Sequence, residues 1–159
     1  MKIELRDACE ADIAAILSDI READVVEMAA IGVTPEMALR DGLKRSDWAL
    51  TGLVDDVPVC MLGVAPKSII LGEGIPWMLA ANGLERAQVR FLKASRPAVK
   101  AMRDSYPKLM NFVHADNHVT IKWLRWLGFS FVPPNWPDDA EPPRYSINGH
   151  PFLLFSIGF

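Results

Sequence analysis

The run of residues 108–131 changes its hydrophobic period from that of a strand to that of a helix, and this change constrains the fold more than any other feature. Residues 109–113 are apolar and β-prone, which predicts a short buried strand. Asp116 and Asn117 then offer side-chain oxygens suited to capping a helix, and apolar residues follow at helical spacing. Gly128 ends this helix, because glycine takes a left-handed conformation without steric cost. The stretch therefore predicts an α/β fold.

This order of strand, capped helix, Gly-Phe and strand resembles the closing half of the GNAT acyltransferase fold. In that family an Asn is followed by a small residue three positions later, then by a Tyr, and finally by Gly-Phe. The residues that stand in this register are Asn117, Thr120, Gly128 and Phe129. Leu124 holds the position of the Tyr, which in acetyltransferases of this family commonly serves as general acid toward the CoA thiolate. Leucine has no proton to give, so the resemblance supports the fold and weakens the case for the reaction.

Length and composition fit one ordered domain over residues 1–159, because half of the residues are hydrophobic and 23% are charged. No apolar run is long enough to cross a bilayer, and the first residues lack the apolar segment of a signal peptide, so we expect a cytoplasmic protein. The net charge of −3 gives no strong signal for nucleic-acid binding. Cys9 and Cys60 form neither a disulfide framework nor a metal motif.

The first half of the chain predicts alternating strands and helices. A strand is expected at 2–6, a helix from near Ala11, a continuation or short second helix over 25–31, and a further helix from 35 to about 46. Two β-prone runs, 48–53 and 57–64, flank Asp55-Asp56 and predict a hairpin. Residues 76–80 predict the next strand. The GNAT resemblance makes this the central strand whose separation from its neighbour admits the pantetheine arm.

The second half adds one long helix and a final hairpin. The long helix carries several basic residues, which we interpret as a solvated face, with a stripe for nucleic acid or an acidic partner as the alternative. Pro97 lies inside it and predicts a kink, or two consecutive helices. Strands are expected from Phe129 to about 132, at 144–147 and at 151–157, the last two joined by Asn148-Gly149. Together these elements predict a mixed, mostly antiparallel twisted sheet with helices on both faces, as in GNAT proteins.

The loop after the central strand bears on the chemistry. Acetyl-CoA enzymes of this family carry an Arg/Gln-x-x-Gly-x-Gly/Ala loop, which turns backbone N–H groups and a helix N-terminus toward the pyrophosphate. Residues 81–87 here read Ala-Asn-Gly-Leu-Glu-Arg-Ala, with one glycine and no basic residue ahead of Gly83. Glu85 would also repel the anion. The sequence therefore predicts that no fully functional cradle is present, and that a degenerate site would bind CoA weakly through Arg86 or Arg90.

Candidate site residues follow from the resemblance if CoA binds at all. The cofactor would contact Trp77, Met78, Leu79, Asn82, Gly83, Arg86 and Asn117. His114 is the candidate general base, because a neutral imidazole can accept a proton from an amine, and Asp116 is the alternative. His114, Asp116 and His118 also suggest a metal site, but they straddle the predicted strand-to-helix junction. We favour the interpretation in which Asp116 and Asn117 cap the helix while the imidazoles border the cleft, and we predict no metal.

A narrower resemblance covers residues 50–155. The residues that carry it are Pro-Val-Cys-Met-Leu-Gly at 58–63, Trp-Met-Leu at 77–79, the long basic helix, residues 106–113, the run from Asn117 to Gly128, and a final strand pair. This order is similar to that of the GNAT-like internal virion proteins of short-tailed phages and their prophage relatives. Members of that group also lack a convincing CoA loop.

Two functional hypotheses compete. In the first, the chain is a phage or prophage protein that has kept the acyltransferase-like fold, has lost catalysis and has no cofactor. It would serve as a structural, internal virion or interaction component, cytoplasmic in the host or packaged in the virion, with other virion proteins or its own copies as partners. In the second, it is an acetyl-CoA-dependent N-acetyltransferase with an atypical cofactor loop. The missing loop and the missing Tyr favour the first hypothesis.

Overall fold

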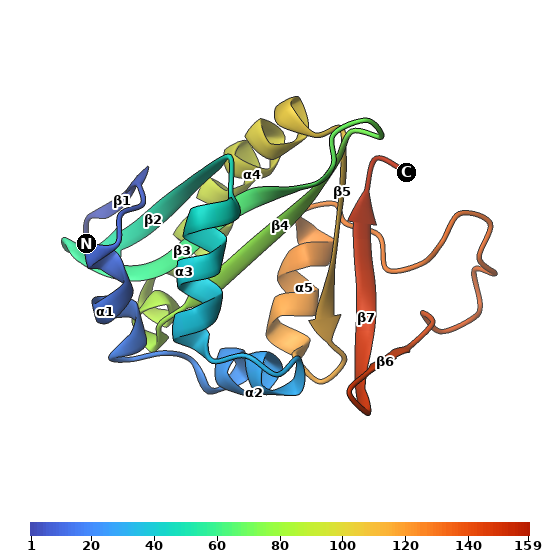
Figure 1. Ribbon diagram of the computed structural model, residues 1–159, viewed down its shortest axis with the longest axis horizontal. Coiled ribbons are helices and arrows are strands. Elements are labelled where there is room, and N and C mark those ends of the chain that lie inside the picture. Colours follow the sequence, from blue (N-terminus) through green and yellow to red (C-terminus); the bar gives the residue numbers. More distant parts are fainter.

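The computed structural model describes all of residues 1–159, which form one seven-stranded sheet with the order β1-β2-β3-β4-β5-β7-β6 (Figure 1). The strands are β1 (Ile3–Asp7), β2 (Trp48–Val54), β3 (Val57–Ser68), β4 (Glu73–Ala80), β5 (Lys108–His114), β6 (Tyr145–Ile147) and β7 (His150–Ile157). Every neighbouring pair is antiparallel except β4 and β5, which run parallel. The predicted mixed, mostly antiparallel sheet is confirmed.

Helices cover both faces of the sheet, as predicted. They are α1 (Ala11–Leu17), α2 (Glu22–Ala30), α3 (Pro35–Arg45), the 3₁₀ helix η1 (Asn82–Ala87), α4 (Gln88–Ser105) and α5 (His118–Trp126). One hydrophobic core lies under η1, α4 and α5, and a smaller one lies under α1 and α3. Alternate residues of β3 divide between them, since Cys60 and Leu62 belong to the first core and Met61 to the second. No helix has the length and apolar character needed to cross a membrane.

The parallel pair β4 and β5 separates soon after it begins, and this separation positions the candidate site. Backbone pairing is confined to Glu73 with Lys108 and Gly74 with Leu109. The next hydrogen bond across the gap comes from a side chain, since Asn111 Nδ2 donates to the Pro76 carbonyl at 2.8 Å. A strand residue directs its N–H and C=O to the same side, so Pro76 offers β5 an acceptor and no donor. The two strands therefore diverge beyond this point.

One prediction about the second half is wrong, and one of two alternatives for another is excluded. Residues 129–132 form no strand: only Ser130 pairs with β7, as a bridge to Ser156, and the Val132 N–H donates to the Ser130 hydroxyl at 3.3 Å instead of to a neighbouring strand. The two prolines that follow, Pro133 and Pro134, cannot donate to a ladder. The helix with Pro97 is also continuous, so the alternative of two helices does not hold.

A buried carboxylate joins the first strand, the second strand and the first helix. Asp12 accepts two hydrogen bonds from Arg6, at 2.9 and 2.8 Å, and one each from the Thr51 hydroxyl at 2.7 Å and the Cys9 N–H at 3.0 Å. Burial raises the pKa of the Asp12 carboxyl, but these hydrogen bonds outweigh it and hold the pKa well below the usual range. The ionised form of Asp12 therefore stabilises the fold.

We predict that Asp12→Asn lowers the free energy of unfolding at neutral pH by about 1–3 kcal/mol, since it weakens a buried charged network. Because the folded-state pKa is depressed, this stabilisation is present above the unfolded-state pKa of about 3.9 and is lost as the pH falls further. Urea unfolding at a series of pH values measures the difference, which shrinks in acid. Asp104→Asn, at an exposed position without hydrogen bonds, is the control. A constant difference between pH 7 and strong acid would contradict this account.

Candidate functional site

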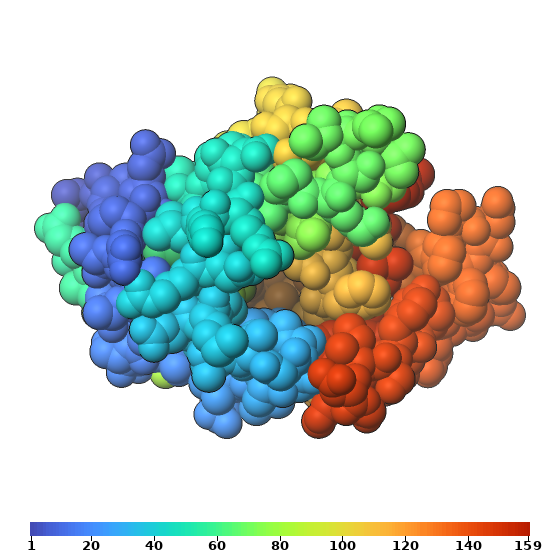
Figure 2. All heavy atoms as spheres, viewed as in Figure 1, coloured from blue at the N-terminus to red at the C-terminus, as the bar shows by residue number.

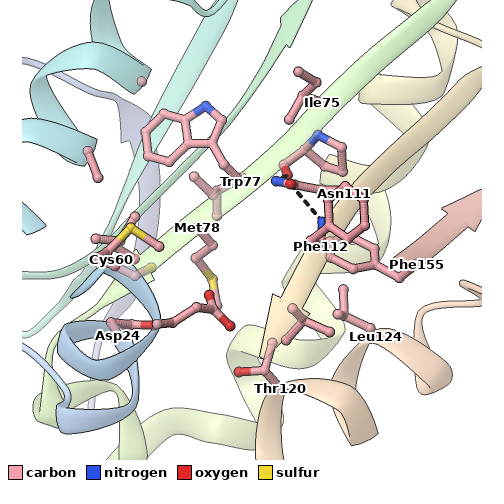
Figure 3. Close-up of a pocket in the computed structure, with 18 of the residues that line it drawn as sticks. Asp24, Cys60, Ile75, Trp77, Met78, Asn111, Phe112, Thr120, Leu124 and Phe155 are labelled. Carbon is pink, nitrogen blue, oxygen red and sulfur yellow. Dashed lines mark hydrogen bonds between the residues drawn. The ribbon is translucent and has the colours of Figure 1, made fainter. Parts of the chain in front are cut away.

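A cavity of about 980 Å³ occupies the gap between β4 and β5. It is lined mainly by hydrophobic side chains and reaches from α2 and α3 on one face of the sheet to α4 and α5 on the other. Figure 2 shows its mouth as a hollow bordered on one side by α2 and α3. In Figure 3, Met78 of β4 lies on one side of this space, with Thr120 and Leu124 of α5 on the other. A mostly apolar cavity with few polar groups is typical of a small-molecule site.

Two carboxylates of α2 close the end of the gap where the strands are furthest apart. The Asp24 carboxylate accepts a hydrogen bond from the backbone N–H of Ala80, the last residue of β4, at 2.9 Å. The Glu27 carboxylate accepts one from His114 N–H, at the end of β5, at 2.7 Å. Both N–H groups would lack a β partner here, and a buried N–H without a partner is costly. One helix therefore satisfies the ends of both separated strands.

The two carboxylates have different electrostatic surroundings. Arg21 donates two hydrogen bonds to Asp24, both at 3.0 Å, and this ion pair is almost fully buried. Glu27 forms no ion pair. Burial raises the pKa of the Glu27 carboxyl above its usual value; the His114 N–H opposes this rise, and the negative charge of Asp24 adds to it. A cavity-lining acid with a raised pKa is a candidate proton acceptor.

Two polar atoms at the start of α5 lack hydrogen-bond partners although they are buried. Asn117 caps the helix through its Oδ1, which accepts from Thr120 N–H at 3.4 Å. The Asn117 Nδ2 group lies near Glu27 and lowers the pKa of that carboxyl, but it does not meet the geometry of a hydrogen bond. Thr120 Oγ1 has no hydrogen-bond partner either. Both residues line the cavity. A ligand with a carbonyl or amide group could satisfy them.

The loop after β4 forms the helix η1, and three of the first N–H groups in this stretch already have acceptors. Ala81 N–H donates to Val59 O at 2.7 Å, Asn82 N–H to Asp19 O at 2.8 Å, and Leu84 N–H to Ala81 O at 3.1 Å. The Asn82 side chain also donates to the Asp19 carboxylate at 3.0 Å, which fixes the loop. An anion cradle needs free N–H groups directed at the ligand. The loop therefore does not fit a pyrophosphate.

Solved structures of acetyltransferases share this architecture. Aminoglycoside acetyltransferase AAC(6')-Ib, solved with ribostamycin and coenzyme A, superposes with a TM-score of 0.68 at 12% identity, covering 99% of this chain and 93% of its own. A GCN5-related N-acetyltransferase from Kribbella flavida gives 0.65 at 18% identity, over 97% and 96%. Ard1 from Thermoplasma volcanium gives 0.66 at 13% identity, over 98% and 97%. The chain has the GNAT fold. No protein-family model and no curated protein matches its sequence.

Within the GNAT fold, the cofactor residues expected from the sequence divide into two groups. Trp77, Met78, Leu79 and Asn117 line the cavity between β4 and β5. Trp77 is also tied to α3, because its indole N–H donates to Ser46 Oγ at 2.7 Å. The other group, Asn82, Gly83 and Arg86, belongs to η1 and lies outside the cavity lining. A single ligand could contact all seven residues only if it extended out of the cavity and across η1.

The two base candidates from the sequence, His114 and Asp116, do not line the cavity. The His114 ring packs edge-on against Phe152 with ring centroids 5.3 Å apart, and its Nδ1 accepts a hydrogen bond from Asp116 N–H at 3.1 Å. The Asp116 side chain is exposed and does not cap α5 as expected, because Asn117 is the N-cap residue. His114, Asp116 and His118 form no metal-ligand set, and no group of three or more His, Cys, Asp and Glu side chains in the structure could hold a metal ion.

The sequence analysis did not identify Asp24 and Glu27 as site residues. The one available signal was the spacing of Arg21, Asp24 and Glu27, which places three charged residues on one face of a helix at intervals of three. Such a face is normally solvated. Here it is turned toward the strand ends, and nothing in the local sequence identifies those partners.

We predict that Asp24→Ala lowers the free energy of unfolding by about 3–5 kcal/mol, because it leaves the buried Arg21 guanidinium unpaired and Ala80 N–H without an acceptor. Denaturant unfolding measures the loss. Glu22→Ala, at an exposed position of the same helix, is the matched control and should change stability by less than about 1 kcal/mol. A small loss for Asp24→Ala would mean that α2 does not hold the strand ends.

Proposed function

We propose that this GNAT-fold protein does not transfer acyl groups and serves as a structural, internal virion or interaction component of a phage or prophage. The observation that carries the loss of catalysis is the Asp24–Ala80 hydrogen bond. It occupies a backbone N–H of the central strand at the end of the gap, beside a loop in which the N–H groups of Ala81, Asn82 and Leu84 are also used. The phage assignment is supported by the sequence resemblance of residues 50–155. In this role the protein is cytoplasmic in the host or packaged in the virion, with virion proteins or other copies as partners.

The apolar Leu124 adds to the proposal. Leu124 lines the cavity. By the sequence resemblance it holds the position at which GNAT acetyltransferases commonly carry a Tyr, and it has no proton to transfer. On this proposal the chain offers acetyl-CoA neither a phosphate-binding loop nor a proton donor. The cavity itself remains, and its apolar wall is compatible with a small ligand that carries no phosphate.

We predict that calorimetric titration with acetyl-CoA at moderate salt gives no detectable heat, while AAC(6')-Ib under the same conditions does. Circular dichroism establishes that the titrated protein is folded. The particle assignment has a separate test, which is to search for the protein by mass spectrometry in purified particles from a producing strain. Micromolar binding would overturn the loss of the cofactor site. Absence from particles would overturn the virion assignment alone.

A second candidate function is that of an N-acetyltransferase with an atypical cofactor loop. The observation that favours it is Glu27, a carboxylate with a raised pKa in the cavity wall close to the unpartnered Asn117 amide. Such a carboxylate would accept a proton from an amine acceptor.

If this candidate is correct, Glu27→Gln lowers the kcat for acetyl transfer to a panel of amines by more than about a hundredfold. General-base catalysis contributes about 10²–10⁴-fold to the rate. Glutamine retains an oxygen to accept the His114 N–H, so the variant should stay folded. Asp116→Asn, at an exposed carboxylate outside the cavity, is the control. Turnover that survives Glu27→Gln would remove Glu27 as the base.

A further inference from the structure

The turn between β3 and β4 exposes three consecutive large aliphatic residues. Ile69, Ile70 and Leu71 are 79%, 97% and 59% exposed. Every other exposed large hydrophobic residue of the chain stands alone in the sequence. Single exposed apolar residues are normal on protein surfaces, whereas a contiguous group marks a contact with something apolar. We call residues 69–71 the apolar tip.

The apolar tip is held in a defined turn. Leu71 N–H donates to the Ser68 hydroxyl at 3.2 Å, and Gly72 N–H donates to Ile69 O at 3.3 Å. Gly72 has a φ of +68°, which glycine adopts without strain. Lys108 N–H then donates to Gly72 O at 3.0 Å and ties the turn to β5. The three side chains are therefore presented outward by a fixed scaffold.

Several basic residues lie near the base of the tip. Lys67 and Lys108 flank it directly, and Arg103 and Lys100 lie at the end of α4 next to Pro107, the residue in contact with Gly72. The nearby carboxylates are Glu73, which is buried and paired with Lys67, Asp104, and Asp47, which accepts a hydrogen bond from the Tyr106 hydroxyl beside Gly74. Phe159, about half exposed, lies beside Lys108. The four basic side chains thus exceed the three carboxylates by one positive charge, in a chain whose net charge is −3.

The shape of the apolar tip and the charge near its base indicate the kind of partner it contacts. Figure 2 shows the β3–β4 turn, in green at the upper right, as a projecting lobe. A projecting apolar tip with cations behind it matches a lipid bilayer, whose acyl chains lie beneath a layer of headgroups. Basic residues near the surface attract anionic lipids. We propose that the apolar tip inserts into the headgroup region of an anionic membrane while Lys67, Lys108 and Arg103 contact lipid phosphates. This inference does not depend on the proposed function.

Co-sedimentation of the purified protein with lipid vesicles tests the proposal. We expect sedimentation with phosphatidylcholine vesicles that contain phosphatidylglycerol, and much less with phosphatidylcholine alone. Ile70→Asp should lower the partition coefficient by more than about tenfold, because it removes a large apolar side chain and adds a charge of the wrong sign. Arg103→Glu should lower it by about fivefold or more at low salt.

Val89→Asp is the matched control, since Val89 is 66% exposed near the opposite end of α4. Ile70 is almost fully exposed, so its replacement should leave the circular dichroism spectrum unchanged. The proposal is overturned if the wild-type protein does not bind anionic vesicles, or if Ile70→Asp and Val89→Asp reduce binding equally. It is also overturned if light scattering shows a dimer that Ile70→Asp converts to a monomer without any vesicle binding, because the tip would then join two copies of the chain.

Discussion

The hydrogen bonds from α2 to the ends of β4 and β5 are the interaction on which the rest of the structure depends. A parallel strand pair that separates leaves backbone N–H groups without partners in the protein interior, and each such group destabilises the fold. Asp24 and Glu27 supply acceptors to both strands from a single helix. The gap can therefore stay open, and the cavity between the strands exists because its far end is closed by side chains rather than by a continuous sheet.

The same interaction limits the chemistry of the site. Any ligand that required the Ala80 N–H would have to displace a carboxylate that is paired with a buried arginine. At the neighbouring loop, the N–H groups of Ala81 and Asn82 are bonded to the carbonyls of Val59 and Asp19. The Asn117 amide and Thr120 hydroxyl have no hydrogen-bond partner in the cavity wall. These two groups suit a ligand with a hydrogen-bond acceptor, and Arg40, Lys44 and Arg45 of α3 add positive charge to the lining.

Much of the fold follows from the sequence, because local patterns encode it. The change of period within residues 108–131 predicted β5 and α5, and Asn117 caps α5 as its side chain indicated. The strand expected from Phe129 is reduced to one bridge at Ser130, because the Ser130 hydroxyl takes the Val132 N–H and two prolines follow. The roles of Asp24 and Glu27 could not be predicted either, since their partners lie 56 and 87 residues away in the sequence.

The position of α2 also ties two distant amide protons to one local event. The N–H protons of Ala80 and His114 are held by acceptors on the same short helix, so they become accessible to solvent together when that helix detaches. Hydrogen exchange at the two sites would then proceed with a shared opening free energy. Although 34 positions separate them in the chain, the ends of β4 and β5 would behave as one cooperative unit whose opening frequency sets how often the interior of the sheet meets water.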